Sequence, residues 1–371
     1  MGKIKIEKSS EKQQFNYKSR LEKLLNLTTE NILITKLENI FYLTGFKGSA
    51  GWLFISNAQK YLLVDSRYFE VASQVADNTN VVLVANLYED TLYLLLEELS
   101  IKQFTIAKNY LYLNEYDNIV SKMTSHSIKV STTNIDIDII RSTKEKEEIK
   151  IIKENLNKAE VALTKTLAFI KEGVSEQELA AELEYQMRKE GGDKTSFDTI
   201  LLFGERSSLP HGVPTDRKLK FGDNILIDFG LSKNGYQSDI TRTLFFGRGN
   251  NFDRMSKIYN IVKDANEKSI EAIKHSVSGK SIDLIARDII KINGYGEYFG
   301  HSLGHGVGIE IHELPRLSPF WDNTLQSGNV VTIEPGIYIP NIGGVRIENM
   351  AVVTKDGCSI LNNTPIDLIV L

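Results

Sequence analysis

The chain has 371 residues, more than one ordinary hydrophobic core accommodates, so its length predicts roughly two domains. Charged residues make up 25% and hydrophobic residues 42%, which is the composition of a soluble globular protein. A formal net charge of −4 gives no electrostatic reason to expect a nucleic acid or an anionic membrane as the partner.

The N-terminal string MGKIKIEKSSEKQQ lacks the apolar segment of a signal peptide, and no apolar run approaches membrane-spanning length. We therefore expect a cytoplasmic protein. The single cysteine, Cys358, cannot form an internal disulfide, which suits a reducing compartment. It follows Gly357 in an expected turn before the last strand, where an inert thiol is favoured over a nucleophile.

Residues 31–134 alternate short apolar runs with segments of helical periodicity, which indicates an α/β domain. We assign residues 1–140 to this N-terminal domain. The expected strands are NILIT, GWLFIS, KYLLVD, VVLVAN and FTIAK, and the expected helices are RYFEVASQVA, DTLYLLLEEL and YLNEYDNIVSKM.

Two capping signals mark the start of a second domain, residues 141–371. Ser142 and Glu145 have capping-box spacing and predict a long helix that runs to Ile170. Ser175 and Glu178 repeat the spacing and open a helix that ends at two consecutive glycines. Strands and hairpins follow, interrupted by the helical segments KIYNIVKDANEKSIEAIKH and SIDLIARDIIKING, so this domain is expected to be α+β.

Five residues of the second domain form a candidate metal cage, with four carboxylates and one imidazole. Such an oxygen-rich set suits hard or borderline divalent ions such as Mn(II) better than a thiolate zinc site does. Four carboxylates balance two dications, and two ions that share a water molecule can activate it for hydrolysis. The pattern therefore predicts a dinuclear metallohydrolase. The strings LIDFG, QSDITRT, GHSLGHGVG, TIEPG and VRIEN supply Asp228, Asp239, His305, Glu334 and Glu348.

The two aspartates lie on either side of a predicted hairpin whose turn is Asn234 and Gly235, the strongest short hairpin signal. Counting outward from that turn places Asp228 opposite Thr241. Asp239 is two positions from Thr241 and therefore points to the same face. The alternative is that one or both aspartates are turn or edge residues.

The two glutamates share a face only if the loop between their strands is odd in length or a bulge intervenes. Pro335 and Pro340 favour such an irregularity, because proline disrupts ladder pairing. Arg346 would then lie on the face of Glu348 and orient it. The alternative for the glutamates is a solvated strand face.

Four of the six histidines fall in glycine- or proline-rich strings: His211, His301, His305 and His312. The glycines argue against reading His301 and His305 as a helical zinc pair and suit backbone that passes close to a ligand. A lone histidine is usually structural, but four in this setting favour a functional site.

Together these strings resemble the pita-bread metallopeptidases, the family of methionine aminopeptidase, Xaa-Pro aminopeptidase and prolidase. The resemblance covers roughly residues 145–365 and fills all five ligand positions in the order Asp, Asp, His, Glu, Glu. The strings FYLTGFKGSAG and LLVDSRYF resemble the creatinase/prolidase-type N-terminal domain, and GHSLGHGVG is similar to the proline-specific branch. The fold implied is an α/β N-terminal domain followed by a pita-bread catalytic domain.

The resemblance also implies roles for these residues. Two divalent ions would bind, with Mn(II) favoured and Co, Fe or Zn possible. Asp228 would chelate one ion, Asp239 and Glu348 would bridge both, and His305 and Glu334 would complete the set. Glu334 would also shuttle a proton, His312 would stabilise the oxyanion, and His211 and His301 would line the proline-side pocket.

The activity implied is that of an Xaa-Pro aminopeptidase acting on short proline-containing peptides, with a prolidase that cleaves only Xaa-Pro dipeptides as the alternative. A creatinase-like amidinohydrolase and an inactive pita-bread binding protein are more distant alternatives, because all five ligand positions are filled. A homodimer or higher homo-oligomer is expected. Trp52 could lie near a neighbouring subunit's cleft, although packing in its own core is favoured.

Overall fold

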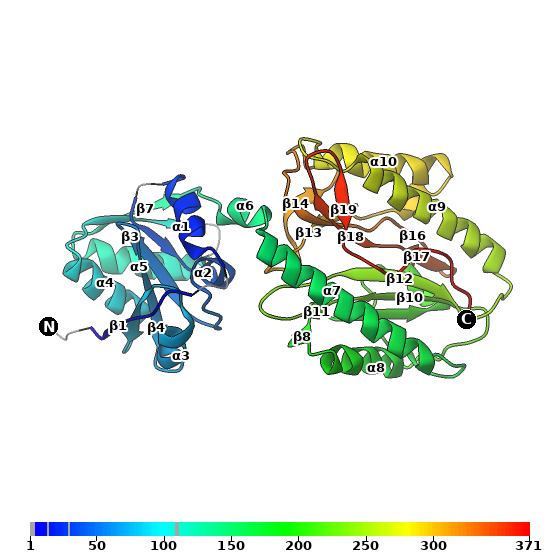
Figure 1. Cartoon of the computed structure of the whole chain (residues 1–371), viewed down its shortest axis with the longest axis horizontal. Coiled ribbons are helices and arrows are strands. Elements are labelled where there is room, and N and C mark those ends of the chain that lie inside the picture. The colour runs from blue at the N-terminus through cyan, green and yellow to red at the C-terminus, as the bar shows by residue number, and fades with distance from the viewer. Residues whose placement is uncertain (1–3, 13–14, 29, 108–110) are drawn as a thin grey trace. The chain divides into compact units, whose positions relative to one another are not determined.

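The structure is a computed structural model that describes residues 4–12, 15–28, 30–107 and 111–371 (Figure 1). The chain divides into two compact units, Met1–Arg141 and Ser142–Leu371. Within the described ranges, no helix is both long enough and apolar enough to cross a lipid bilayer.

The first unit is built on a 7-stranded mixed sheet in the order β1-β5-β4-β3-β2-β6-β7. The pairs β4–β5, β2–β6 and β6–β7 are parallel, while β1–β5, β2–β3 and β3–β4 are antiparallel. The strands are β1 Ile6–Lys8, β2 Ile32–Ile34, β3 Trp52–Ser56, β4 Gln59–Asp65, β5 Asn80–Val84, β6 Gln103–Ala107 and β7 Lys129–Thr133. This arrangement confirms the predicted α/β class.

Helices connect the strands of this unit, and three of them match predicted segments: α3 Phe69–Val75, α4 Tyr88–Glu98 and α5 Leu113–Thr124. Two further helices, α1 Tyr17–Leu25 and α2 Leu37–Thr44, were not predicted from the sequence, and α6 Ile137–Ser142 lies at the unit boundary. Trp52 is 9% exposed and packs in the core, with its ring centroid 5.0 Å from that of Tyr88. The favoured core position of Trp52 is therefore confirmed.

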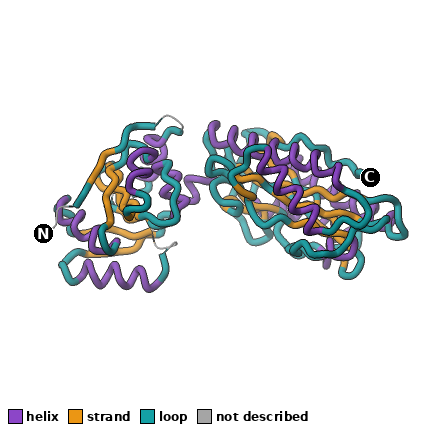
Figure 2. Tube along the Cα trace, turned by 90° about the horizontal axis from the view of Figure 1, so that it is seen from below, coloured by secondary structure: helices purple, strands orange, loops and turns teal. Residues whose placement is uncertain are grey.

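The second unit combines two helix pairs with several antiparallel sheets (Figures 1 and 2). The helix α7 Lys146–Thr166 packs with α8 Glu176–Lys189, and α9 Phe252–Ala272 packs with α10 Gly279–Ile292. The sheets have the orders β12-β10-β9, β14-β13-β15-β18-β19, β11-β8 and β16-β17. The strands are β8 Lys194–Thr195, β9 Ile200–Phe203, β10 Asn224–Phe229, β11 Leu231–Ser232, β12 Ile240–Phe245, β13 Gly304–Gly306, β14 Glu313–Leu317, β15 Val330–Ile333, β16 Gly336–Ile339, β17 Gly343–Arg346, β18 Asn349–Val353 and β19 Cys358–Ile360.

The first capping prediction is wrong by three residues. Ser142 ends α6, and the capping box at α7 is formed by Glu145 with Glu148. The helix also stops at Thr166 and continues only as a short 3₁₀ turn, Leu167–Phe169. The second capping box is confirmed, since the Ser175 side chain accepts a hydrogen bond from the Glu178 backbone at the start of α8.

The aspartate hairpin has the register that counting predicted. Asp228 in β10 pairs with Thr241 in β12, and the turn residues Asn234 and Gly235 have φ values of 54° and 84°. Two consecutive positive φ angles are what a two-residue type I′ turn requires.

The glutamate hairpin has a loop of odd length, which is the condition under which Glu334 and Glu348 share a face. Ile339 pairs with Gly343 across a loop of three residues, 340–342, which is an odd number. Ile333 pairs with Asn349 and Gly336 pairs with Arg346, so the two ladders share one register. Glu334 and Glu348 fall opposite each other in the interruption between them.

Cys358 begins the last strand, β19, and is partly buried. Burial raises the pKa of its thiol, which disfavours the reactive thiolate.

Gly304 lies where β13 approaches β15 too closely for a side chain, because a Cβ atom there would come within 2.0 Å of the Thr332 carbonyl oxygen. We expect Gly304→Ala to lower the free energy of unfolding by about 1–3 kcal/mol, measured by urea denaturation, since the strands must separate to admit the methyl group. Gly300→Ala is the matched control, because nothing lies within 4 Å of the Cβ position there. Equal stability of the two variants would contradict this account of the β13–β15 contact.

Candidate metal centre

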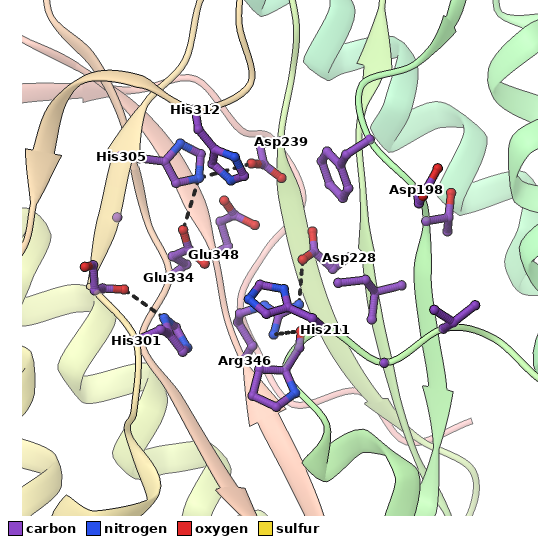
Figure 3. Close-up of a pocket in the computed structure, with 18 of the residues that line it drawn as sticks. Asp198, His211, Asp228, Asp239, His301, His305, His312, Glu334, Arg346 and Glu348 are labelled. Atoms are coloured by element: carbon purple, nitrogen blue, oxygen red, sulfur yellow. Dashed lines mark hydrogen bonds and ion pairs between the residues drawn. The ribbon is translucent and has the colours of Figure 1, made fainter.

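Three carboxylates converge from three strand ends in the second unit (Figure 3). Asp228 lies in β10, Asp239 directly precedes β12, and Glu348 directly precedes β18. One carboxylate oxygen from each lies within 4.8 Å of the others. The predicted diagonal placement of the two aspartates thus brings them together, with Glu348 as a third member.

His305 and Glu334 complete the cluster. The Nε2 atom of His305, in β13, lies 3.5 Å from Asp239 Oδ2 and 3.3 Å from Glu334 Oε1. Its Nδ1 atom lies 3.1 Å from the Gly306 carbonyl, which can only accept, so Nδ1 carries the proton. This tautomer leaves the Nε2 lone pair directed at the carboxylates, as a metal ligand requires.

The carboxylates repel one another in a buried setting. Burial, followed by repulsion from its neighbours, raises the pKa of Asp239 and of Glu348 well above the ordinary carboxyl value. Burial also raises the pKa of Asp228, although Arg346 works against this. Burial acts in the same direction on Glu334, but the combined effect of His305, His301 and Arg346 outweighs burial and lowers the pKa to about 2.

In Asp228 and Glu348, one carboxylate oxygen accepts a hydrogen bond from a protein side chain and the other does not. Arg346 donates to Asp228 Oδ2 at 2.5 Å, and Thr241 donates to Glu348 Oε2 at 2.8 Å. Among the described residues, Asp228 Oδ1 and Glu348 Oε1 are buried and have no hydrogen-bond partner. Buried oxygens without donors, in a cluster of like charges, fit divalent cations that prefer oxygen ligands.

Arg346 lines the site, and its direct carboxylate partner is Asp228. Its sequence position predicts that Arg346 orients Glu348, whereas its guanidinium contacts Asp228 directly. It reaches Glu348 only through Thr241, to whose hydroxyl its Nε donates at 3.1 Å. The contact with Glu348 is indirect because the long arginine side chain extends to the neighbouring sheet. The same count from the hairpin turn places Thr241 opposite Asp228, so its position beside the cluster could have been predicted.

His301 connects to Arg346 through Tyr338, a residue that the sequence analysis missed. Its Nδ1 donates to the Ser302 carbonyl at 2.8 Å, so its Nε2 accepts from the Tyr338 hydroxyl at 2.9 Å. Arg346 donates to the same hydroxyl at 2.7 Å, and burial raises the pKa of Tyr338 to about 12. Tyr338 lies in the short apolar strand β16, and the sequence of that strand does not identify it as a site residue.

The two remaining histidines lie at the rim of the site. The ring of His312 is exposed and lies 4.4 Å from that of His305, centroid to centroid. Partial burial and the neighbouring His305 lower the pKa of His312 to about 4, which keeps the imidazole neutral at pH 7. His211 is exposed in the loop after the 3₁₀ turn Gly204–Ser208, where the adjacent Pro210 carbonyl accepts from Arg346.

A cavity of about 810 Å³ unites these groups. All nine predicted site residues line it: His211, Asp228, Asp239, His301, His305, His312, Glu334, Arg346 and Glu348. Asp198 and Arg316 also line it, although no sequence signal pointed to them, and Asp198 lies apart from the carboxylate cluster in Figure 3. Arg316 pairs with His305 across β13 and β14, which places it on the same face.

The antiparallel sheets with their two helix pairs, and the acidic cluster with its histidine, define a metallopeptidase of the pita-bread fold. The model of metallopeptidase family M24 matches residues 150–355, and that of the creatinase/prolidase N-terminal domain matches residues 20–143. The chain belongs to metallopeptidase family M24, and the predicted resemblance is confirmed.

Several relatives cover almost the whole chain. An Xaa-Pro dipeptidase of Pyrococcus furiosus is 38% identical, over 95% of this chain and 100% of its own. A solved Xaa-Pro dipeptidase from Bacillus anthracis is 39% identical, with a TM-score of 0.91 over 96% of this chain and 100% of its own. A solved X-Pro aminopeptidase from Thermotoga maritima is 35% identical, with a TM-score of 0.88 over 96% of this chain and 99% of its own.

The raised carboxyl pKa values make the metal-free fold dependent on pH. A folded state with a raised pKa holds its proton after the unfolded chain has released it, so stability falls as pH rises above the unfolded value. For a carboxyl group this loss begins above about pH 4 and continues through the higher folded pKa.

We expect Asp239→Asn to raise the melting temperature of chelator-treated protein at pH 8 by roughly 2–4 °C, since it removes one repelling charge. The same substitution should abolish the rise in melting temperature that Mn(II) produces in the unmodified protein. Scanning fluorimetry with chelator and with Mn(II) measures both effects, and Asp356→Asn in an exposed turn is the control. A variant that is less stable without metal and still responds fully to Mn(II) would contradict the repulsion argument.

Proposed function

We propose that this chain is an Xaa-Pro aminopeptidase, which releases the N-terminal residue from short peptides with proline at the second position. The proposal is supported by relatives named Xaa-Pro dipeptidase and X-Pro aminopeptidase that align over nearly the whole chain. An oxygen-rich ligand set favours Mn(II) as the metal.

The size of the cavity carries the choice of aminopeptidase over dipeptidase. Ligand pockets usually measure roughly 300–1,000 Å³, and drug-sized ligands fill them. The cavity of about 810 Å³ lies in the upper part of that range. A volume of this size is compatible with a substrate one residue longer than an Xaa-Pro dipeptide, which supports the aminopeptidase.

Asp228, Asp239, His305, Glu334 and Glu348 would hold the metal ions. When bound, divalent ions supply Lewis-acid polarisation of the scissile carbonyl and lower the pKa of a water molecule. Glu334 accepts a proton and passes it to the imino nitrogen of the leaving proline.

The histidines act on the substrate. His312, which is neutral, donates a hydrogen bond to the oxygen that gains negative charge as the carbonyl is attacked. His301, whose tautomer is set by Ser302 and Tyr338, lines the proline side together with His211 and orients the peptide.

Arg316 favours the second candidate, an Xaa-Pro dipeptidase. Of the residues that line the cavity in the described ranges, Arg316 and Arg346 are the arginines, and Arg346 is engaged by Asp228 and Tyr338. The exposed Arg316 side chain is thus the cation available to a peptide carboxylate. In a dipeptide that carboxylate belongs to the proline itself.

His305→Ala tests the metal assignment. We expect it to lower metal content per chain, measured by elemental analysis after dialysis, and to lower kcat/KM on an Xaa-Pro-Yaa peptide by at least about a hundredfold, because a ligand at the centre of the cluster is lost. His275→Ala, a histidine outside the cavity, is the control. Normal turnover and metal content in His305→Ala would refute the site.

A substrate panel separates the two activities. We expect Mn(II)-loaded protein to cleave Xaa-Pro-Yaa tripeptides with kcat/KM at least equal to that for the Xaa-Pro dipeptide, and to leave Xaa-Ala-Yaa peptides intact. Cleavage confined to dipeptides would favour the dipeptidase. In that case Arg316→Gln should raise KM for the dipeptide by about tenfold or more, because a charge-assisted hydrogen bond is lost.

A further inference from the structure

The backbone ladder is incomplete beside the two glutamates. Pro335 lies opposite Ile347, whose N–H donates to the Pro335 carbonyl at a long 3.4 Å. An antiparallel pair of this kind normally exchanges two hydrogen bonds. Proline has no N–H, so it cannot return the bond to the Ile347 carbonyl.

The backbone N–H groups of the glutamates do not close this gap. Glu334 donates to the Leu303 carbonyl at 2.8 Å, and Glu348 donates to the Thr241 carbonyl at 3.2 Å. Each glutamate is therefore tied to a different outer strand. Between the two glutamate segments, the direct backbone contact at this point is the long Ile347–Pro335 bond.

Asn266, on helix α9, supplies the hydrogen-bond donor that Pro335 lacks. It is 0% exposed, and its amide nitrogen donates to the Ile347 carbonyl at 3.2 Å and to the Ile333 carbonyl at 2.7 Å. The side-chain oxygen of Asn266 accepts a hydrogen bond from the side-chain amide nitrogen of Asn349 at 3.1 Å. Both amide hydrogens and the amide oxygen are thus used, and all three contacts go to residues next to Glu334 or Glu348.

We propose that Asn266 is a positioning residue of the metal centre, which sets the separation of the Glu334 and Glu348 carboxylates by bridging the two strands where Pro335 interrupts them. This inference rests on the proposed metal-dependent function. Asn266 does not line the cavity, so it acts on the ligands through the residues beside Glu334 and Glu348.

Metal affinity is the property that this bridge controls. Ligands taken from two separate strands bind ions well only when their spacing is fixed before binding, and partners that orient ligands typically contribute about 10–100-fold in affinity. Loss of the bridge leaves all five ligands in place and widens the range of their separations. Affinity for metal should fall, while chemistry at saturating metal should change little.

The experiment uses the full-length protein with Asn266→Ala, and with Asn266→Ser as a second variant whose hydroxyl is too short to reach both carbonyls. Ser269→Ala is the matched control, since Ser269 lies on the same helix, is 0% exposed, and has a hydroxyl without a hydrogen-bond partner among the described residues. Isothermal titration with Mn(II) gives the Kd, and kcat and KM for an Xaa-Pro-Yaa peptide are measured at limiting and at saturating Mn(II).

We expect the Kd for Mn(II) to rise by about tenfold or more in both Asn266 variants and by less than twofold in Ser269→Ala, with kcat restored at saturating Mn(II). An unchanged Kd in whichever Asn266 variant folds, or a rise equalled by Ser269→Ala, would overturn the positioning role. Measurements on the unmodified protein distinguish the proposed function from the role of Asn266. If the unmodified protein does not bind Mn(II) or cleave the peptide, the proposed function itself is wrong.

Discussion

Four carboxylates crowded into one buried site are the constraint on which the second unit depends. Burial and mutual repulsion raise the pKa of three of them, and the guanidinium of Arg346 directly neutralises Asp228. Such a cluster is stable only if cations or protons offset its charge. The same feature that destabilises the metal-free fold thus creates affinity for divalent ions, and the surrounding strands serve to keep the carboxylates from moving apart.

The chain meets this constraint by taking three of the four carboxylates from positions directly before or after a strand. At such points a side chain can leave the regular pleat while the backbone on either side stays paired. Asp239 and Glu348 directly precede their strands, and Glu334 directly follows its strand. Thr241 and Arg346 then link the aspartate hairpin to the glutamate hairpin, so the two sheets hold one site between them.

How far the sequence predicts this site depends on how local each relationship is. The Asp228–Thr241 register follows from counting around one tight turn, and the structure has that pairing. For the two glutamates to share a face, the loop between their strands had to contain an odd number of residues. The prolines indicated an irregularity there but not that the loop has three residues. Contacts across the fold were harder to predict: Tyr338 occupies an ordinary strand position, and Arg346 was predicted as a site residue without its direct contact to Asp228. The capping error at Ser142 has a local origin instead, since Glu145 and Glu148 form a competing capping box three residues further on.

Pro335 shows why the local and the distant parts of the site belong together. A proline directly after Glu334 releases that segment from regular pairing, which frees its carboxylate to turn toward the cluster, but it also removes a ladder hydrogen bond. A lost donor in a buried ladder must be replaced, because an unsatisfied carbonyl there costs about as much as the bond itself. The replacement comes from Asn266, nearly seventy positions earlier in the chain, whose two amide hydrogens match the two carbonyls that flank the break. The proline is visible in the sequence and its compensating partner is not, since only the packing of α9 against these strands brings them into contact.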